Sequence, residues 1–444
     1  MSEGMALFLI FVFIVAFIIL FTSKLGLHPF LALLISAIIG GIFAGMPLTK
    51  TLQAIAEGFG LTLKNIGIVI ALGSIIGYIL EKSGGAVRMA ESVLKVVGEK
   101  RSVLAMSITG FLVSIPVFCD SGFIILSSLN RALSKRSKIS LSVFATALSM
   151  GLYSSHDFVP PTPGPLASAS NLGVDIGLVI LMGIVVSMPS VFAGYFWAVK
   201  YAKKFNITVT EDDSITKENE VLPGRFISFM PIIFPVVLIA LKSVADFPSH
   251  PFGSGILMTL FDFVGHPITA LMIGVFFSFF LVKKLSKKVI NDWVGEGLKS
   301  AGVIILITGA GGSLGEVLKE IRVGIVFGDF LSRFNLGIFL PFVISAAFKT
   351  AQGSSTVAMI TTSALIAPLL GGLGFDSQFG RLLVVLSISA GSMVVSHIND
   401  SYFWVVSQFS DMDVSTAYKC QTIGSLITGI AGIIGIALIS LIVL

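Results

Sequence analysis

Charged residues are scarce in this chain, because Asp, Glu, Lys and Arg make up only 12% of its 444 residues while 55% are hydrophobic. A water-soluble core does not use so many apolar side chains, so the composition excludes a soluble globular domain and indicates a protein that spans lipid. At about 20 residues per span, the length suits about ten to twelve membrane spans joined by short loops.

Cysteine is also nearly absent, since Cys119 and Cys420 are the only two. They form no metal-binding spacing and no disulfide framework, and the chain lacks a His-Glu-x-x-His motif. We therefore expect no metal, no other cofactor and no enzymatic activity. The net charge of +5 comes from basic residues in loops, without an interleaved aromatic face, which argues against binding to nucleic acid.

Loops rich in Lys and Arg predict which side of the membrane faces the cytoplasm. Such loops lie at residues 82–101, 131–138, 200–204 and 283–288. The segment 102–130 is too long for one span at about 1.5 Å per helical residue, and basic loops flank it on both sides. We therefore expect a re-entrant hairpin with its tip near residues 116–122, and a second hairpin over residues 337–370.

A polar stretch with five acidic residues, 206–224, separates two halves of the chain. It is the predicted cytoplasmic linker between a first transmembrane half, residues 1–205, and a second, residues 225–444.

The two halves share short motifs in the same order; for example, Ser155-His156 recurs as Ser396-His397. The span directions of this scheme make the halves inverted repeats, which favours alternating access around a central site. The predicted fold is an all-α polytopic membrane protein. It has two inverted-topology repeats of transmembrane helices, each with a re-entrant hairpin and an unwound helix.

Polar and charged residues interrupt the apolar segments at matching places in both halves. A charge in hydrocarbon costs several kcal/mol, so these residues indicate a polar cavity with a function. At the first predicted tip the candidates for substrate binding are Asp120, Ser121 and Gly122. Asp120 could hold a proton, a cation or a substrate hydroxyl, or it could only cap the following helix.

The second predicted tip combines hydroxyl groups, an amide and a helix N-terminus, which together suit an anion. Its candidate binding residues are Lys349, Gln352, Gly353, Ser354, Ser355 and Thr356. Lys349 could contact an anionic substrate, or it could be the counter-ion of Asp120, Asp157 or Asp400.

Two long segments, 139–168 and 381–409, are expected to unwind in the middle. They carry the remaining candidates for substrate binding, which are His156, His397 and Asn399. A His or Asp in a partly wet cavity titrates easily, as proton coupling requires. The predicted proton-coupling residues are Asp120, Asp157 and Asp400. The alternative for these groups is an ordinary hydrogen bond between helices.

These interruptions resemble those of the gluconate:proton symporter (gluconate permease) family, within the ion-transporter superfamily. The segments that carry the resemblance are residues 115–123, 156–165, 352–356 and 396–401. The resemblance implies a multi-pass carrier of the bacterial inner membrane that takes up a small anionic sugar acid together with protons. The superfamily implies inverted repeats, re-entrant hairpins and a homodimer that works by an elevator motion.

The sequence therefore predicts a secondary active transporter, a proton-coupled symporter of gluconate or a related hydroxycarboxylate. Its expected partners are the sugar acid, protons and membrane lipid, and its energy source is the proton gradient. One alternative is a sodium-coupled di- or tricarboxylate carrier on the same scaffold. The others are an intramembrane metal-dependent enzyme that uses His156, Asp157, His397 and Asp400, and a channel.

Overall fold

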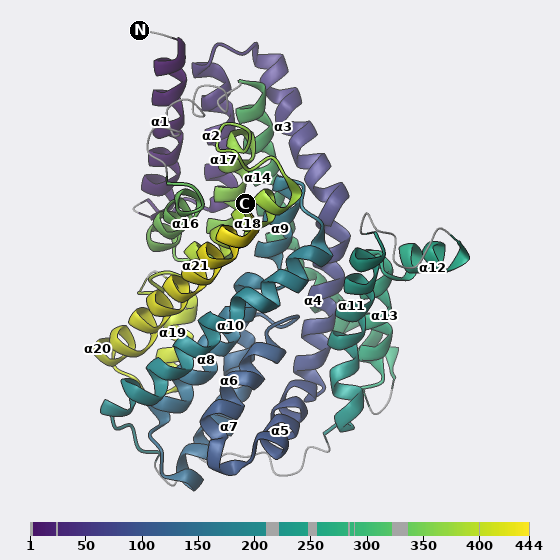
Figure 1. Ribbon diagram of the computed structural model, residues 1–444, viewed down its shortest axis with the longest axis vertical. Coiled ribbons are helices and arrows are strands. Elements are labelled where there is room, and N and C mark those ends of the chain that lie inside the picture. Colours follow the sequence, from purple (N-terminus) through teal and green to yellow (C-terminus); the bar gives the residue numbers. More distant parts are fainter. Residues whose placement is uncertain are drawn as a thin grey trace.

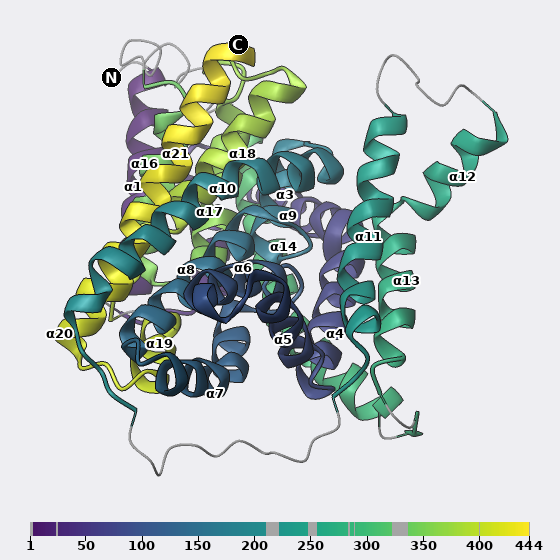
Figure 2. The same ribbon diagram turned by 60° about the horizontal axis from the view of Figure 1, so that its bottom comes forward.

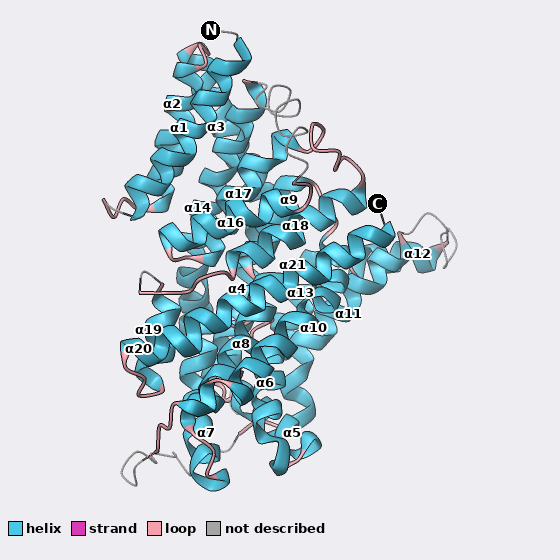
Figure 3. Cartoon of the chain, turned by 60° about the vertical axis from the view of Figure 1, so that its left-hand side comes forward, coloured by secondary structure: helices cyan, strands magenta, loops and turns pink. Residues whose placement is uncertain are grey.

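In the part of the chain that it describes, the computed structural model contains helices joined by loops, and no strand (Figure 3). It describes residues 3–23, 25–209, 222–246, 255–282, 285–287, 289–321, 336–398 and 400–443. Within these ranges, five helices are long and apolar enough to cross a membrane, and one bent pair makes a sixth. The other predicted spans contain shorter helices, several of them joined at breaks.

The described helices fall on both sides of the predicted linker. Those of the first half are α1 (Glu3–Ser23), α2 (Pro29–Phe43), α3 (Leu48–Thr62), α4 (Ile68–Lys82), α5 (Gly85–Val97), α6 (Ser102–Val113), α7 (Cys119–Ser137), α8 (Leu141–Phe158), α9 (Pro163–Leu172) and α10 (Ile176–Lys200). Those of the second half are α11 (Arg225–Ala245), α12 (Ile256–Val264), α13 (Pro267–Phe279), α14 (Val294–Glu320), α16 (Phe339–Gln352), α17 (Ser355–Ile366), α18 (Gln378–Ser392), α19 (Ser401–Phe409), α20 (Val414–Ala417) and α21 (Ile423–Val443). A π-helical turn, η1 (Leu63–Gly67), joins α3 and α4 into one continuous segment.

The helices form two packing groups (Figure 1). In the α14 group, α14 packs on α2, α3 and α4, and α13 packs on α4. In the α8–α18 group, α8 packs on α6, α7 and α10, while α18 packs on α16, α17 and α21. The groups meet where α14 lies against α17 and α9. Figure 2 shows α11 to α13 on one flank, away from α8 and α18.

Three of the four basic loops meet at one end of the molecule, the lower end in Figure 1. Arg136, in the last turn of α7, pairs with Glu99 before α6 at 2.9 Å. Ser140 donates a hydrogen bond to the Phe205 carbonyl oxygen beyond α10 at 2.8 Å. This grouping agrees with the prediction that these loops share one side of the membrane. The fourth basic loop, residues 283–288, lies partly outside the described residues. Residues 210–221 of the predicted linker lie wholly outside them.

Equivalent close contacts occur in the two halves. A Cβ atom at Gly151 on α8 would lie 2.1 Å from a carbonyl oxygen of α6, and one at Gly391 on α18 would lie 2.3 Å from a carbonyl oxygen of α16. His28 and His266 likewise cap α2 and α13, each accepting a backbone N–H at Nδ1 at 3.3 Å. These matched contacts support the expected internal repeat. Its inverted topology stays a prediction.

Short breaks join the helices at both predicted hairpins. Residues 114–118 join α6 to α7, and Gly353 and Ser354 join α16 to α17; each pair of helices packs together. Gly353 ends α16 in the left-handed region at φ +82°, where an L side chain would be strained. Ser354 then caps α17, because its Oγ accepts the Val357 N–H at 3.3 Å. The first break ends earlier than expected, so Asp120, Ser121 and Gly122 lie in the first turn of α7.

The two long interrupted segments are also broken near their middles. α8 ends at Phe158 because the prolines that follow, at 160 and 161, lack the N–H that a helix needs, and α9 starts with Pro163 at its first position. Residues 393–400 separate α18 from α19, and Val395 among them has φ +58°. A β-branched residue in the left-handed region costs about 1–3 kcal/mol, so the rest of the fold enforces this conformation.

Candidate functional site

A cavity of about 210 Å³ lies where both hairpin breaks and both broken segments meet. The elements that surround it are the starts of α7, α17 and α19, the end of α8, the end of α16 and the middle of α14. Its lining residues are Phe118, Cys119, Asp120, Tyr153, His156, Ile304, Ile307, Lys349, Ser354, Ser355, Thr356, Val357, Ile360, Asp400, Ser401 and Tyr402. Apart from Ile304 and Ile307 on α14, the lining residues lie on helices of the α8–α18 group, on α19, which packs on α7 of that group, or in the breaks just before α7, α17 and α19.

Three helix N-termini face this cavity, those of α7, α17 and α19. The first turn of a helix presents unpaired N–H groups and a partial positive charge. Ser354 caps α17, and Asp400 caps α19 by accepting the Tyr402 N–H at 3.0 Å. Caps fix the direction of each helix start, and the remaining N–H groups create a positive potential in the cavity.

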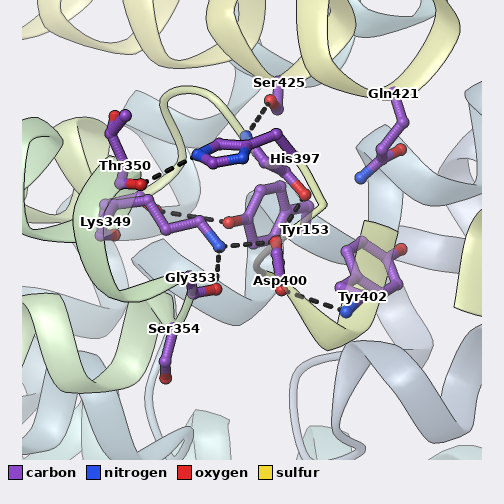
Figure 4. A network of polar contacts seen from close by, with 12 residues as sticks. Tyr153, Lys349, Thr350, Gly353, Ser354, His397, Asp400, Tyr402, Gln421 and Ser425 are labelled. Atoms are coloured by element: carbon purple, nitrogen blue, oxygen red, sulfur yellow. Dashed lines mark hydrogen bonds and ion pairs between the residues drawn. The ribbon is translucent and has the colours of Figure 1, made fainter. Parts of the chain in front are cut away.

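Lys349 and Asp400 form a buried ion pair at the edge of the cavity (Figure 4). The Lys349 ammonium lies 2.6 Å from Asp400 Oδ2 and 2.6 Å from the Gly353 carbonyl oxygen. It also lies 5.6 Å from the centre of the Tyr153 ring. Asp400 Oδ2 further accepts the Ser396 hydroxyl at 2.5 Å. Lys349 therefore has its charge matched within the protein and links the end of α16 to the start of α19.

Within the described part of the chain, Asp120 has no such counter-ion. Its side chain is half-buried, its Oδ1 has no hydrogen-bond partner among the described residues, and its carboxylate lies beside the Ser401 hydroxyl. A carboxylate oxygen that is buried without a donor is costly unless a ligand, a proton or water supplies the missing bond. Asp120 is therefore the acid in the lining that is best placed to bind a ligand.

Aromatic rings form the other walls of the cavity. Tyr153 and Tyr402 pack at 5.4 Å between ring centres, and their hydroxyl groups donate to the carbonyl oxygens of Ser392 and Ser149. The His156 ring lies 6.0 Å from Phe118, and its Nδ1 has no partner among the described residues. The lining is thus mixed, with flat apolar surfaces and several polar atoms, as small-molecule sites usually are.

The structure brings seven of the fourteen predicted site residues into the lining of one cavity. Those that line the cavity are Asp120, His156, Lys349, Ser354, Ser355, Thr356 and Asp400. The predicted residues outside the lining are Ser121, Gly122, Asp157, Gln352, Gly353 and His397, and Asn399 lies outside the described residues. Their predicted roles stay predictions.

The residues outside the lining still lie next to it. Gly353 offers its carbonyl oxygen to Lys349, and Asp157 Oδ2 accepts the Ser392 hydroxyl at 3.2 Å. His397 Nε2 lies 2.9 Å from the Thr350 carbonyl oxygen (Figure 4). This contact connects the break between α18 and α19 to the end of α16.

Sequence reasoning missed Tyr153, Tyr402, Cys119 and Ser401 as lining residues. Helical spacing could have found Tyr153, because it precedes His156 by three residues and so shares its face of α8. The two isoleucines of α14 gave no signal, because an apolar residue in an apolar helix is typical of simple packing.

A larger cavity of about 460 Å³ lies between α3, α9, α14 and α17 and contains none of the predicted site residues. The charged groups in its lining are already paired: Lys319 bonds to Glu316 at 2.9 Å, and Arg381 lies 3.7 Å from Asp376. The smaller cavity has the unpaired acid and the helix starts, so we regard it as the candidate binding site.

The description of a known family fits this arrangement. A family model described as the GntP family permease matches residues 5–442. The chain belongs to this permease family. The expected resemblance is confirmed, and so is the expectation of a multi-pass inner-membrane permease rather than an enzyme. The described residues contain no group of three or more His, Cys, Asp or Glu side chains that could hold a metal ion.

Several relatives match the permease along almost its whole length. It is 33% identical to the gluconate permease of Pseudomonas aeruginosa over 97% of this chain and 96% of that protein. It is 31% identical to the low-affinity gluconate transporter of Escherichia coli K12 over 95% of each chain, and 38% identical to an uncharacterized permease of Haemophilus influenzae. The solved YdaH transporter of Alcanivorax borkumensis shares the fold, with a TM-score of 0.69 at 12% identity over 94% of this chain and 99% of that one.

Proposed function

We propose that the permease is a proton-coupled symporter of gluconate or a related small sugar acid, which it carries across the inner membrane by alternating access. The observation that supports this most strongly is the cavity, where three helix N-termini and several hydroxyl groups surround one acid without a counter-ion. The names of relatives at 31–33% identity support the substrate class.

The start of α17 is the proposed site of the substrate carboxylate. Ser354, Ser355 and Thr356 line the cavity there, and they offer hydroxyl groups next to unpaired backbone N–H groups. Lys349 contributes a positive electrostatic potential. Its ammonium group is not free to bind the substrate, because Asp400 and the Gly353 carbonyl oxygen already bind it. Gluconate hydroxyl groups would then reach Asp120, Ser401 and the imidazole of His156 across the cavity.

The charges around the cavity favour cotransport with a cation. Lys349 and Asp400 balance each other, which leaves Asp120 in the lining and Asp157 behind it without a basic partner among the described residues. Adding an anionic substrate would place several negative charges in a site shielded from water, and such charges repel strongly at low dielectric. A proton on one of the acids would remove this repulsion and let the loaded site cross the membrane.

The composition of the lining also favours an elevator-like movement, in which one group of helices carries the site past the other. The α14 group contributes only Ile304 and Ile307, whose apolar side chains make no polar bond that movement would break. The proposal includes re-entrant hairpins at residues 102–130 and 337–370, two inverted repeats joined by the 206–224 linker, and a homodimer.

Uptake into proteoliposomes tests the proposal directly. We expect labelled gluconate to accumulate when an inward proton gradient is imposed, and not when an inward sodium gradient replaces it. Unlabelled sugar acids should compete, whereas succinate and citrate should compete poorly. Asp120→Asn should abolish uptake, because the substrate hydroxyl groups lose the carboxylate that is proposed to accept them. Accumulation driven by sodium alone, with citrate as a strong competitor, would instead favour the di- or tricarboxylate carrier.

A further inference from the structure

Asp157 occupies a separate position behind the cavity. Its side chain is fully buried and does not line the cavity, and its Oδ1 has no hydrogen-bond partner among the described residues. Its Oδ2 lies 3.2 Å from the Ser392 hydroxyl, but that hydroxyl also lies 2.7 Å from the Ser389 carbonyl oxygen. A hydroxyl has one hydrogen to donate, so Asp157 has at most a shared donor on this side.

Ser355 is a neighbour of Asp157 that lines the cavity. It is the first residue of α17, and its hydroxyl lies close to the Asp157 carboxylate and to the Tyr153 hydroxyl. The same hydroxyl therefore adjoins the buried acid on one side and the proposed carboxylate position on the other. Its single hydrogen can serve only one of the two acceptors at a time.

We propose that Asp157 holds the coupled proton and that Ser355 relays its protonation state to the substrate. This inference rests on the proposed function and assigns its coupling step to named atoms. When Asp157 is ionised, the Ser355 O–H turns to the carboxylate and supplies the hydrogen bond that Oδ1 lacks in the structure. When Oδ1 takes a proton from water, its new O–H donates to Ser355 Oγ, and the Ser355 hydrogen becomes free to bond the substrate carboxylate. Release of the proton to water on the other side of the membrane reverses both steps.

The other two acids do not suit this role. Asp400 is held by Lys349, Ser396 and the Tyr402 N–H, so a proton there would break an ion pair. Asp120 lies in the cavity itself, where the substrate would contact it. The titratable or charged groups near Asp157 come from its own helix and from three other elements; they are Tyr153, His156, Cys119, Lys349 and Asp400. Of these, the oppositely charged Lys349 already pairs with Asp400.

Two transport assays with purified full-length protein in proteoliposomes separate coupling from binding. Exchange of labelled for unlabelled gluconate, without a pH gradient, needs binding and movement but no net proton transfer. Accumulation under an inward proton gradient needs all three. We expect Asp157→Asn to keep exchange and lose accumulation, whereas Asp120→Asn loses both. Accumulation by Asp157→Asn at the wild-type level would overturn the inference.

The relay is tested by a matched pair of serine variants. The wild-type half-saturating gluconate concentration for exchange should rise as pH increases, because ionised Asp157 takes the Ser355 hydrogen. Ser355→Ala should weaken binding at low pH by about tenfold, the equivalent of one hydrogen bond to a charged group, and should remove the pH dependence. Ser392→Ala, which removes the other hydroxyl beside Asp157 but lies outside the cavity, should keep it.

Each outcome gives a definite answer. The relay would be refuted if the half-saturating gluconate concentration of Ser355→Ala still depended on pH. It would also be refuted if Ser392→Ala lost this pH dependence to the same extent. If the wild type accumulated gluconate above its external concentration without any proton gradient, the proposed coupling itself would be refuted, and the assignment of Asp157 with it. The proposed coupling and the relay would both be supported if the wild type accumulated gluconate only under a proton gradient, and if the pH dependence of binding were lost in Ser355→Ala but kept in Ser392→Ala.

Discussion

Breaking the ion pair between Lys349 and Asp400 from one side should cost far more stability than breaking a surface ion pair of similar length. Lys349 is 1% exposed and Asp400 6%, and the two charged atoms lie 2.6 Å apart. Lys349→Met would leave the Asp400 carboxylate buried with one hydroxyl and one backbone N–H as donors. Stranding one member of a buried pair costs about 3–5 kcal/mol, so we expect a loss of unfolding free energy in that range.

A double-mutant cycle isolates the pair. Lys349→Met combined with Asp400→Asn removes both charges, and the amide oxygen of asparagine can still accept the Tyr402 N–H, so the double variant should recover most of the loss. The matched control is Lys50→Met, since Lys50 pairs with Glu320 at 2.8 Å but is 58% exposed and should contribute only about 0–1 kcal/mol. The measurement is the unfolding free energy in mixed micelles titrated with a denaturing detergent. Equal effects of Lys349→Met and Lys50→Met would refute the reasoning.

Other changes give separate checks. Ser354→Ala removes the cap of α17 and should cost about 1 kcal/mol of stability, with weaker gluconate exchange in proteoliposomes. Gly151→Ala places a methyl group 2.1 Å from a carbonyl oxygen of α6 and should cost about 1–3 kcal/mol of unfolding free energy, whereas Gly60→Ala, with nothing within 4 Å, should be neutral or stabilising. Gluconate should slow alkylation of Cys119, which lines the cavity, and should leave Cys420 unaffected, as mass spectrometry of the labelled protein would show. Equal protection of both cysteines would contradict the location of the binding site.

Much of the helical organisation follows from local chemistry that a sequence displays. The consecutive prolines at 160 and 161 end α8, because neither has the N–H that another turn needs, and a Gly followed by Ser, as at 353 and 354, marks a helix end and a new cap. The exact break before α7 was less predictable. Asp120 is a good residue for the first helical turn as well as for a loop, so the sequence did not decide between these positions.

The site was harder to predict in its details because it depends on which atoms face each other. Sequence reasoning proposed Lys349 either as a substrate contact or as a counter-ion, and the structure shows it bonded to Asp400. Asp157 and His156 are neighbours in sequence, yet His156 lines the cavity and Asp157 lies behind it, because successive residues of a helix point about 100° apart. Only packing between α8, α17 and α18 determines which of the two meets the ligand.

Proton movement that accompanies gluconate tests the central claim most directly. Proteoliposomes would contain the permease and a trapped pH-sensitive dye, with no initial pH gradient and with the membrane potential clamped at zero. Adding gluconate outside should acidify the interior of wild-type vesicles and should leave the interior pH unchanged with Asp157→Asn. Gluconate entry without acidification in the wild type would contradict proton symport.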